Sequence, residues 1–188
     1  MKPGLLVLNA GSSSVKFAAF QVREGAPDHD AVLRGQIAGL AREPRFQVRE
    51  RGGGESARKL DAKQVPDHRA AIDWILAWLE ERRLGLRWQG VGHRIVHGGG
   101  RDGPARVDAA VLAELERLCP LAPHHQPHNL AAVRAMAEAA PSLPQVVCFD
   151  TAFHAGQPEV ARMLPLPAEL RDRGLVRYGF HGLSYEYV

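Results

Sequence analysis

Apolar and polar residues along the first third of the chain follow the patterns of β-strands. Residues 5–8 form a short apolar run, which predicts a buried strand. Residues 11–14 read Gly-Ser-Ser-Ser and predict a turn, and residues 15–22 predict a second strand, so a hairpin is expected. One face of that second strand is predicted to carry Val15, Phe17 and Ala19. Further strands of the same sheet are predicted at residues 33–37 and 46–48.

The remainder of the chain switches between helical and strand patterns. Asp67 is predicted to cap a helix, because apolar residues recur after it at helical spacing. Asp108 is predicted to cap another helix, which Pro120 and Pro123 would end. Further helices are predicted at residues 127–140 and near 167–173, and further strands at 91–97 and 146–149. A hairpin-led sheet followed by alternating helices and strands predicts an α/β domain with a mixed sheet.

Composition narrows the class of protein. Of the 188 residues, 45% are apolar and 24% charged, which is enough to build a core. The net charge is +3, but the cations are scattered among acidic residues, so we expect no nucleic-acid partner. No apolar run is long enough to span a membrane, and the N-terminus lacks a signal-peptide pattern. Cys119 and Cys148 lack metal-ligand or redox spacing, which predicts reduced, buried thiols in a cytoplasmic protein.

The first candidate for chemistry is the turn at residues 9–16, Asn-Ala-Gly-Ser-Ser-Ser-Val-Lys. Backbone N–H groups in a tight turn can converge on an anion, and Ser hydroxyls and Lys16 would add to phosphate binding. The spacing is not that of a Walker loop. An ordinary Ser-rich hairpin turn has the same composition, so that interpretation stays open.

The second candidate is Arg94, in a predicted strand that enters Gly98-Gly99-Gly100. Arg94 and Val96 would share one strand face, which suits a small amphiphile with a carboxylate or phosphate and a methyl group. A solvent-facing arginine is the alternative. The third candidate is the histidine-rich segment 124–128. Adjacent histidines in an extended chain point apart, so a substrate-facing or helix-capping role is favoured over a zinc site.

The fourth candidate is Asp150, at the carboxyl end of a predicted buried strand, where open α/β sheets place functional groups. A turn or helix cap is the alternative role for it. The fifth is His181, which lies between Phe180 and Gly182 and can approach a ligand from a constrained backbone. A neutral histidine buried in the core is the alternative.

Taken in order, five motifs closely resemble those of the acetate kinase family. They lie at residues 9–16, 92–99, 121–129, 149–154 and 177–182. The resemblance runs from residue 5 to the last residues, and it covers only the N-terminal part of a family chain. It implies an actin-like, ribonuclease-H-like fold of two related α/β domains with the active site between them. Residues 1–150 would form the first domain and residues 151–188 the start of the second.

The resemblance also implies the reaction and its cofactors. The family transfers the γ-phosphoryl group of ATP reversibly to acetate, giving acetyl phosphate and ADP, with Mg²⁺ or Mn²⁺. Its members are usually homodimers. On the ATP side, it implies that Asn9 helps to hold the metal ion, that Lys16 contacts ATP, and that Ser12 and Ser14 line the same loop.

On the acetate side, the resemblance implies three catalytic residues. Arg94 would bind the carboxylate and the transferring phosphoryl group, Asp150 would be the essential acid, and His181 would stabilise the transition state. The substrate-binding positions are Arg94, Val96, His125 and Phe180, with Val96 and Phe180 lining the methyl pocket. Donors aimed at the transferring group are what phosphoryl transfer requires.

Four positions depart from the family pattern: His124, Gln126, Leu183 and Tyr185. His124 stands where an apolar pocket residue is usual, so a related kinase acting on propionate or butyrate is the alternative enzyme. The adenosine-binding loops of the family would lie further on, so we expect these 188 residues alone to be inactive or nearly so. A non-catalytic folding or dimer-forming module is the remaining alternative.

Overall fold

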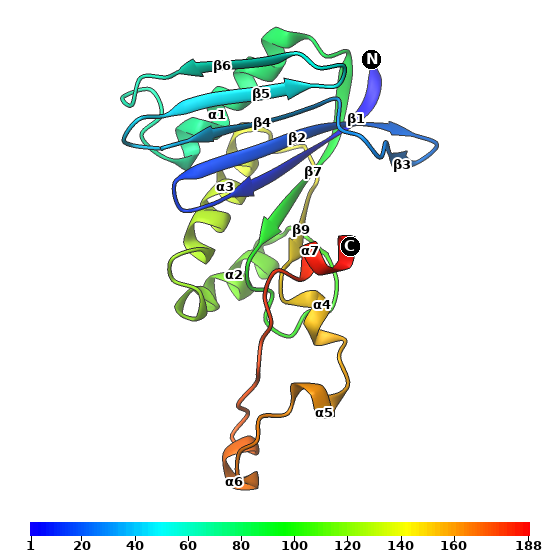
Figure 1. The fold of residues 1–188 in the computed structure, drawn as a ribbon, viewed down its shortest axis with the longest axis vertical. Coiled ribbons are helices and arrows are strands. Elements are labelled where there is room, and N and C mark those ends of the chain that lie inside the picture. Colours follow the sequence, from blue (N-terminus) through cyan, green and yellow to red (C-terminus); the bar gives the residue numbers. More distant parts are fainter.

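The computed structural model describes residues 1–188, apart from the side chain of Arg171. Its described residues form one nine-stranded sheet in the order β6-β5-β4-β2-β1-β7-β9-β8, with β3 paired to β2 (Figure 1). The strands are β1 (Lys2–Ala10), β2 (Ser14–Arg23), β3 (Ala26–Pro27), β4 (Leu33–Ala38), β5 (Arg45–Glu50), β6 (Glu55–Lys59), β7 (Leu86–Ile95), β8 (Ala105–Arg106) and β9 (Gln145–Phe149).

The sheet is mixed, as predicted. Strands β1, β7 and β9 run parallel, while β1, β2, β4, β5 and β6 form an antiparallel meander. In the predicted hairpin of β1 and β2, Asn9 pairs with Lys16. The carboxyl ends of the three parallel strands therefore meet at one edge, together with the hairpin turn.

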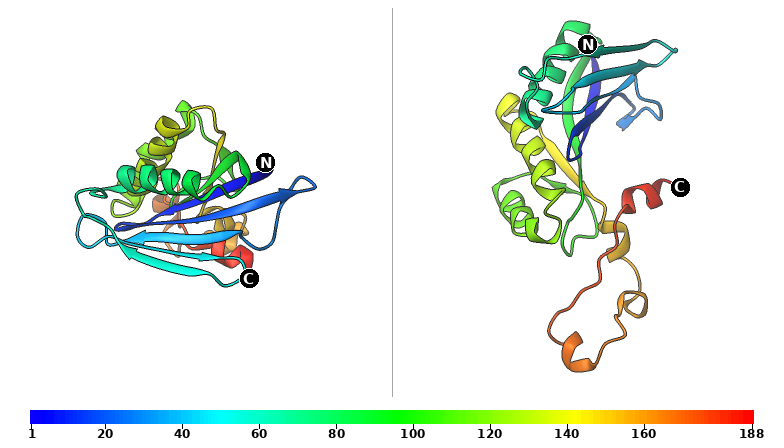
Figure 2. Two further views of the ribbon diagram at one scale, coloured as in Figure 1. Left: turned by 90° about the horizontal axis from the view of Figure 1, so that it is seen from above. Right: turned by 60° about the vertical axis from the view of Figure 1, so that its left-hand side comes forward.

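Three longer helices cover one face of the sheet (Figure 2). They are α1 (His68–Arg82), α2 (Ala109–Arg117) and α3 (Gln126–Ala139), with a 3₁₀ turn at Cys119–Leu121. The predicted caps are confirmed: Asp67 accepts a hydrogen bond from the Ala70 N–H and Asp108 from the Val111 N–H. Short helices follow: α4 (Ala152–Ala155), α5 (Glu159–Arg162), α6 (Ala168–Arg171) and α7 (Gly182–Tyr187). Helices α5 and α6 lie on an arm that extends away from the sheet (Figure 1).

The core lies between the sheet and the three longer helices α1, α2 and α3. Val15, Phe17 and Ala19 are buried on the inner face of β2, as the alternation predicts. The ring of Phe46 packs against those of Phe17 and Trp78. A second cluster under the ends of β7 and β9 includes Ile95, Leu115 and Phe149. This cluster fixes the strand ends that carry Arg94 and Asp150.

Several predicted boundaries were wrong. Strand β7 begins at Leu86, before the predicted start at residue 91, and it ends at Ile95. Val96 and His97 therefore lie beyond the strand, because side chains of α3 take their backbone N–H groups. Strands β3, β6 and β8 were not predicted; all of β6 is exposed, so it has no apolar alternation.

The two cysteines are free thiols, as predicted, but each is half-buried rather than fully buried. Burial raises the pKa of both thiols, which keeps them protonated and unreactive at neutral pH. Among the described residues, no helix combines the length and apolarity needed to cross a membrane.

Candidate active site

Arg94 lies at the centre of the candidate site and is held on two sides. Its Nε atom donates to both carboxylate oxygens of Asp150 at 3.0 and 3.2 Å, and its Nη2 atom donates to Asp150 Oδ2 at 2.5 Å. Its Nη1 atom donates to Asn9 Oδ1 at 3.2 Å. The structure therefore brings together three residues that are 56 and 85 positions apart along the chain.

This meeting follows from the topology. Asn9, Arg94 and Asp150 lie at the carboxyl ends of the parallel strands β1, β7 and β9. Functional groups of open α/β sheets gather at this edge. The Asp150 side chain is only 2% exposed, whereas that of Arg94 is 31% exposed. The carboxylate is thus a buried anchor, and the guanidinium keeps access to solvent.

The turn between β1 and β2 presents N–H groups to solvent. The carbonyl oxygens of Ala10 and Gly11 accept hydrogen bonds from Asn129 and His68 at 2.6 Å each. The carbonyl of Ser13 accepts from the N–H groups of residues 39 and 40. Within the described structure, the N–H groups of Ser12 and Ser13 have no acceptor. The carbonyl groups of this turn are thus bonded within the protein, while two N–H groups stay free. Such a turn is suited to binding an anion.

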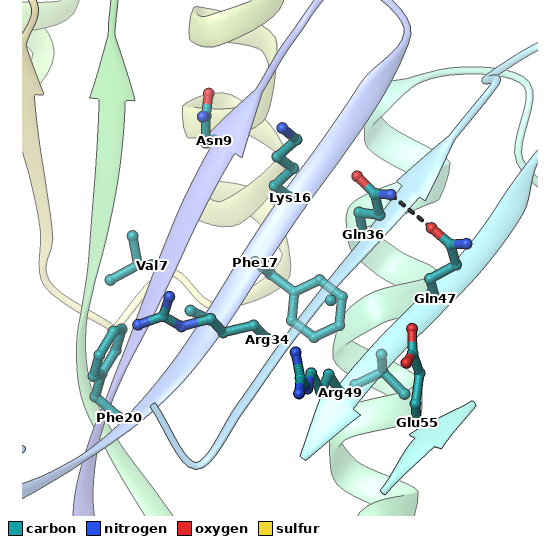
Figure 3. A pocket seen from close by; sticks show the side chains of 13 residues that line it. Val7, Asn9, Lys16, Phe17, Phe20, Arg34, Gln36, Gln47, Arg49 and Glu55 are labelled. Carbon is teal, nitrogen blue, oxygen red and sulfur yellow. Dashed lines mark hydrogen bonds between the residues drawn. The ribbon is translucent and has the colours of Figure 1, made fainter. Parts of the chain in front are cut away.

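Lys16 and Asn9 face the same side of the sheet, opposite to the helices. Figure 3 shows both side chains at one end of a hollow of about 530 Å³ on this outer face. Arg34 and Arg49 also line the hollow, and among the described residues neither has an ion-pair partner. Arg94 does not line it, so the hollow adjoins the Arg94 site at Asn9. Ser12 is exposed and Ser14 is half-buried in the turn itself.

His181 is placed beside Asp150 by the backbone. The N–H of Gly182 donates to the Asp150 carbonyl at 2.9 Å. His181 is the N-cap of α7, and its φ of 61° puts it in the left-handed region that residues with a Cβ avoid. The side chain is exposed and makes no cap hydrogen bond. Strained backbone of this kind is often retained where a side chain must be aimed.

The two proposed methyl-pocket residues are connected through His97. Val96 is 8% exposed, and the ring of its neighbour His97 packs edge-on against those of Tyr178 and Phe180. His97 Nδ1 accepts from the Gly99 N–H at 3.0 Å, and burial lowers the pKa of His97. A neutral ring at this position gives the segment an apolar surface. Phe180 itself is 38% exposed, so it has area left for a ligand.

His125, which the resemblance implies is near the phosphoryl group, belongs to a group of three histidines next to the turn. It is exposed at the start of α3, and no contact with Arg94 is found among the described residues. His128 stacks on His68, with ring centroids 4.8 Å apart. Burial, followed by the charges of His68 and His125, lowers the pKa of His128. These three histidines thus lie under and beside the turn, with His68 in direct contact with Gly11.

Four buried polar residues next to the site were not singled out from the sequence as functional. They are His68, His97, Gln126 and Asn129, which are all buried. All four bind backbone groups of the turn or of the segment after β7. A signal was present for Gln126 and Asn129, since both belong to the third motif, residues 121–129, at the start of a predicted helix. The backbone atoms that they bind come close only in the folded chain.

Asn9, the residue that the resemblance assigns to the metal ion, is bonded to Arg94 in this structure. Asn9 Oδ1 and the Asp150 carboxylate both face the guanidinium of Arg94, which would repel a cation. In the part of the chain that the structure describes, no group of three or more His, Cys, Asp or Glu side chains could hold a metal ion. The role of Asn9 as a metal ligand therefore stays a prediction.

Comparison with known proteins gives consistent matches over almost the whole chain. Residues 4–188 match the sequence model described as "Acetokinase family". An acetate kinase of Rhodopseudomonas palustris is 46% identical over all of this chain, which covers 47% of that protein. A crystal structure of Porphyromonas gingivalis acetate kinase matches 97% of this chain with a TM-score of 0.84 and 33% identity, over 46% of its own length. A propionate kinase of Francisella tularensis matches 98% with a TM-score of 0.83 and 28% identity, over 47% of its own length. The chain thus spans about half the length of these relatives.

Proposed function

This chain belongs to the acetokinase family and has its actin-like fold, and from that premise we propose that it supplies the acetate-binding and phosphate-binding side of a phosphotransferase site. The reaction is the reversible transfer of the γ-phosphoryl group of ATP to acetate, giving acetyl phosphate and ADP. One observation carries this proposal: Arg94 is fixed by Asp150 and Asn9 beside a turn with free N–H groups.

The geometry of Arg94 suits it to two successive tasks. A guanidinium has five N–H donors, and four contacts to Asp150 and Asn9 use the Nε hydrogen and one hydrogen on each terminal nitrogen. One N–H on Nη1 and one on Nη2 remain for a ligand. A carboxylate or a phosphoryl group can take both. Arg94 would thus bind acetate first and then the equatorial oxygens of the transferring group.

The other groups complete the site around that ligand. The turn N–H groups of Ser12 and Ser13, with Lys16 and the hydroxyls of Ser12 and Ser14, would bind the phosphate tail of ATP. Val96 and Phe180 would contact the methyl group, and His181 would add a donor to the transition state. Asp150 would act by holding Arg94 in place. His125 would assist from the side of the turn.

The wider properties that the resemblance implies belong to the same proposal. Residues 1–150 would be the first domain and residues 151–188 the beginning of the second. Mg²⁺ would reach the site with ATP, because that ion usually binds through phosphate oxygens and water. It would supply charge neutralisation of the phosphates. A homodimer in the cytoplasm, without a nucleic-acid or membrane partner, completes the proposal.

Anion titrations test the proposed site in this chain. We expect tripolyphosphate and acetate to bind with heat changes measurable by calorimetry, and Arg94→Gln to weaken acetate binding at least ~10-fold, since a charged bidentate contact is lost. The matched control is Arg106→Gln, since Arg106 is an exposed arginine in the short edge strand β8 and has no hydrogen bond to Asn9 or Asp150. Equal affinities for the wild type and Arg94→Gln would contradict the proposed role of Arg94.

A second candidate acceptor is propionate. The Francisella relative is named a propionate kinase, and His124 is exposed next to His125 at the start of α3. A methylene group in a pocket changes discrimination by ~1–3 kcal/mol. Comparing acetate, propionate and butyrate in the same titration separates these acceptors. A chain that stays folded but binds none of these anions would be the non-catalytic module.

A further inference from the structure

The side chain of Asn129 connects the two chain segments of the proposed site, the turn after β1 and the segment after β7. It lies in α3 and is 2% exposed. Its Nδ2 atom donates to the Ala10 carbonyl at 2.6 Å, and its Oδ1 atom accepts from the Val96 N–H at 2.9 Å. Ala10 follows Asn9 directly, and Val96 lies two residues after Arg94. One buried amide therefore spans the ends of β1 and β7.

The sheet itself does not make this connection. The parallel pairing of β1 with β7 ends at Leu8 and His93. Beyond that pair, the chain segments that carry Asn9 and Arg94 have no ladder between them. A carbonyl only accepts and an N–H only donates, so the two partners fix which way the Asn129 amide faces. The amide thus continues the linkage between the strands where the ladder stops.

We propose that Asn129 is a positioning residue, which sets the spacing between the turn of residues 9–14 and the segment that carries Arg94. An anion on the turn N–H groups then lies within reach of the guanidinium. Asn129 touches neither the anion nor Arg94. The inference rests on the proposed function only for the identity of that anion. Displacements of about 1 Å in such sites cost about 10²-fold in rate, so small changes in this spacing matter.

Gln126 offers a matched control in the first turn of the same helix. It is a fully buried amide, as Asn129 is. Its Oε1 atom accepts from the His97 N–H at 3.1 Å, and its Nε2 atom donates to the carbonyls of His97 and Leu115 at 2.9 and 3.3 Å. None of these partners belongs to β1 or to the turn. Changes at Gln126 should therefore affect the segment after β7 without moving the turn.

The test removes one of the two hydrogen bonds of Asn129 and keeps the other. Asn129→Asp keeps an oxygen for the Val96 N–H but loses the donor for the Ala10 carbonyl when the new carboxyl group is ionised. When protonated, that carboxyl group is again a donor, and burial raises its pKa. We would measure tripolyphosphate affinity and amide NMR spectra of the 188-residue chain between pH 5 and pH 8. The variants are Asn129→Asp, Asn129→Ala and Gln126→Glu.

For Asn129→Asp, we expect wild-type affinity at low pH and a loss of about 10-fold relative to wild type at pH 8. The Gly11 amide, which shares a peptide group with the Ala10 carbonyl, should shift over the same pH range while the Val96 amide stays protected. Asn129→Ala should lose affinity at every pH, with both amides affected. Gln126→Glu should change the His97 amide and leave Gly11 and the affinity near wild type.

Equal effects of Asn129→Asp and Gln126→Glu on affinity would overturn the inference, since any buried change would then suffice. A pH-independent loss in Asn129→Asp would overturn it as well. If that variant does not fold at pH 8, the comparison of Asn129→Ala with Gln126→Glu decides in the same way. If the wild type binds no tripolyphosphate, the proposed phosphate site fails. The Gly11 and Val96 amides then still decide whether Asn129 connects the two segments.

Discussion

Gly182 donates its backbone N–H to the carbonyl oxygen of Asp150 at 2.9 Å. This bond holds the start of α7 against the end of β9. It therefore fixes the backbone position of His181, the residue before Gly182. A Cβ atom added to Gly182 would overlap the Asp150 carbonyl and the Cβ of Phe153. The close approach of two backbones explains why glycine occupies this position.

The first prediction follows from that contact. Gly182→Ala should release α7 from β9 and lower the free energy of unfolding by ~1–3 kcal/mol, as overpacking does. Limited proteolysis should then cut near residues 180–188 faster than in the wild type. Gly103→Ala is the control, because a Cβ there meets no atom within 4 Å. Indistinguishable proteolysis of the two variants would contradict the proposed anchoring.

The second prediction concerns the charge that Asp150 balances. Asp150→Asn should lower the free energy of unfolding by ~2–3 kcal/mol, because it leaves the Arg94 guanidinium without its carboxylate. The value is below that for fully buried pairs, since water reaches Arg94. Urea denaturation of the wild type and of Asp150→Asn measures this difference in the free energy of unfolding. Asp73→Asn, which removes an exposed partner of Arg69, should cost under ~0.5 kcal/mol. A larger loss in the control than in Asp150→Asn would refute this account.

The third prediction is a loss of stability in acid that originates at His93. Burial lowers the pKa of His93 from 6.5 to about 4, against a smaller raising effect of its hydrogen bond to Gln145. The unfolded chain therefore takes up the proton first. The contribution of neutral His93 is complete above about pH 6.5 and is lost as the pH falls toward 4. Between pH 7 and pH 5 the loss is about 2 kcal/mol.

Thermal unfolding at pH 7 and pH 5 checks the His93 prediction. His93→Gln cannot take up a proton, so its midpoint should fall less between the two pH values than that of the wild type. The lowered pKa values of His97 and His128 act in the same direction and remain in both proteins. An equal fall in the two proteins would show that His93 is not the group responsible.

Much of the site was predictable because two of its residues directly follow apolar runs that predict buried strands. Asn9 and Asp150 each follow an apolar run, and such runs predict buried strands whose ends meet. The structure confirms that Asn9, Arg94 and Asp150 lie together. The caps Asp67 and Asp108 were equally predictable, since each precedes a helical apolar pattern.

The remaining features depend on contacts that leave no periodic pattern. Strand β6 is polar and exposed throughout, and only its pairing with β5 makes it a strand. The end of β7 is set by the side chains of Gln126 and Asn129, which take the next two backbone N–H groups. A local sequence pattern does not reveal a hydrogen bond to a backbone group some 30 residues away. The same limit applies to His68 and the Gly11 carbonyl.

The fourth prediction concerns turnover. The chain spans about 47% of its relatives, and its site is open, with Lys16 exposed and Arg94 partly exposed. Phosphoryl transfer to a carboxylate needs a cleft that excludes water, because the acyl phosphate hydrolyses readily. We therefore expect no ATP- and acetate-dependent formation of ADP by the 188-residue chain in a coupled assay. Robust turnover would contradict this expectation.

The central claim is that the turn of residues 9–14 and Arg94 form a single anion site, and one NMR titration tests it most directly. Tripolyphosphate is added to the ¹⁵N-labelled chain, and the Ser12 and Ser13 amides are followed together with the Arg94 Nε–H. The account predicts that all three signals shift along one binding curve with one Kd. If the Arg94 signal stays fixed while the turn amides move, or if no signal moves, the claim is wrong.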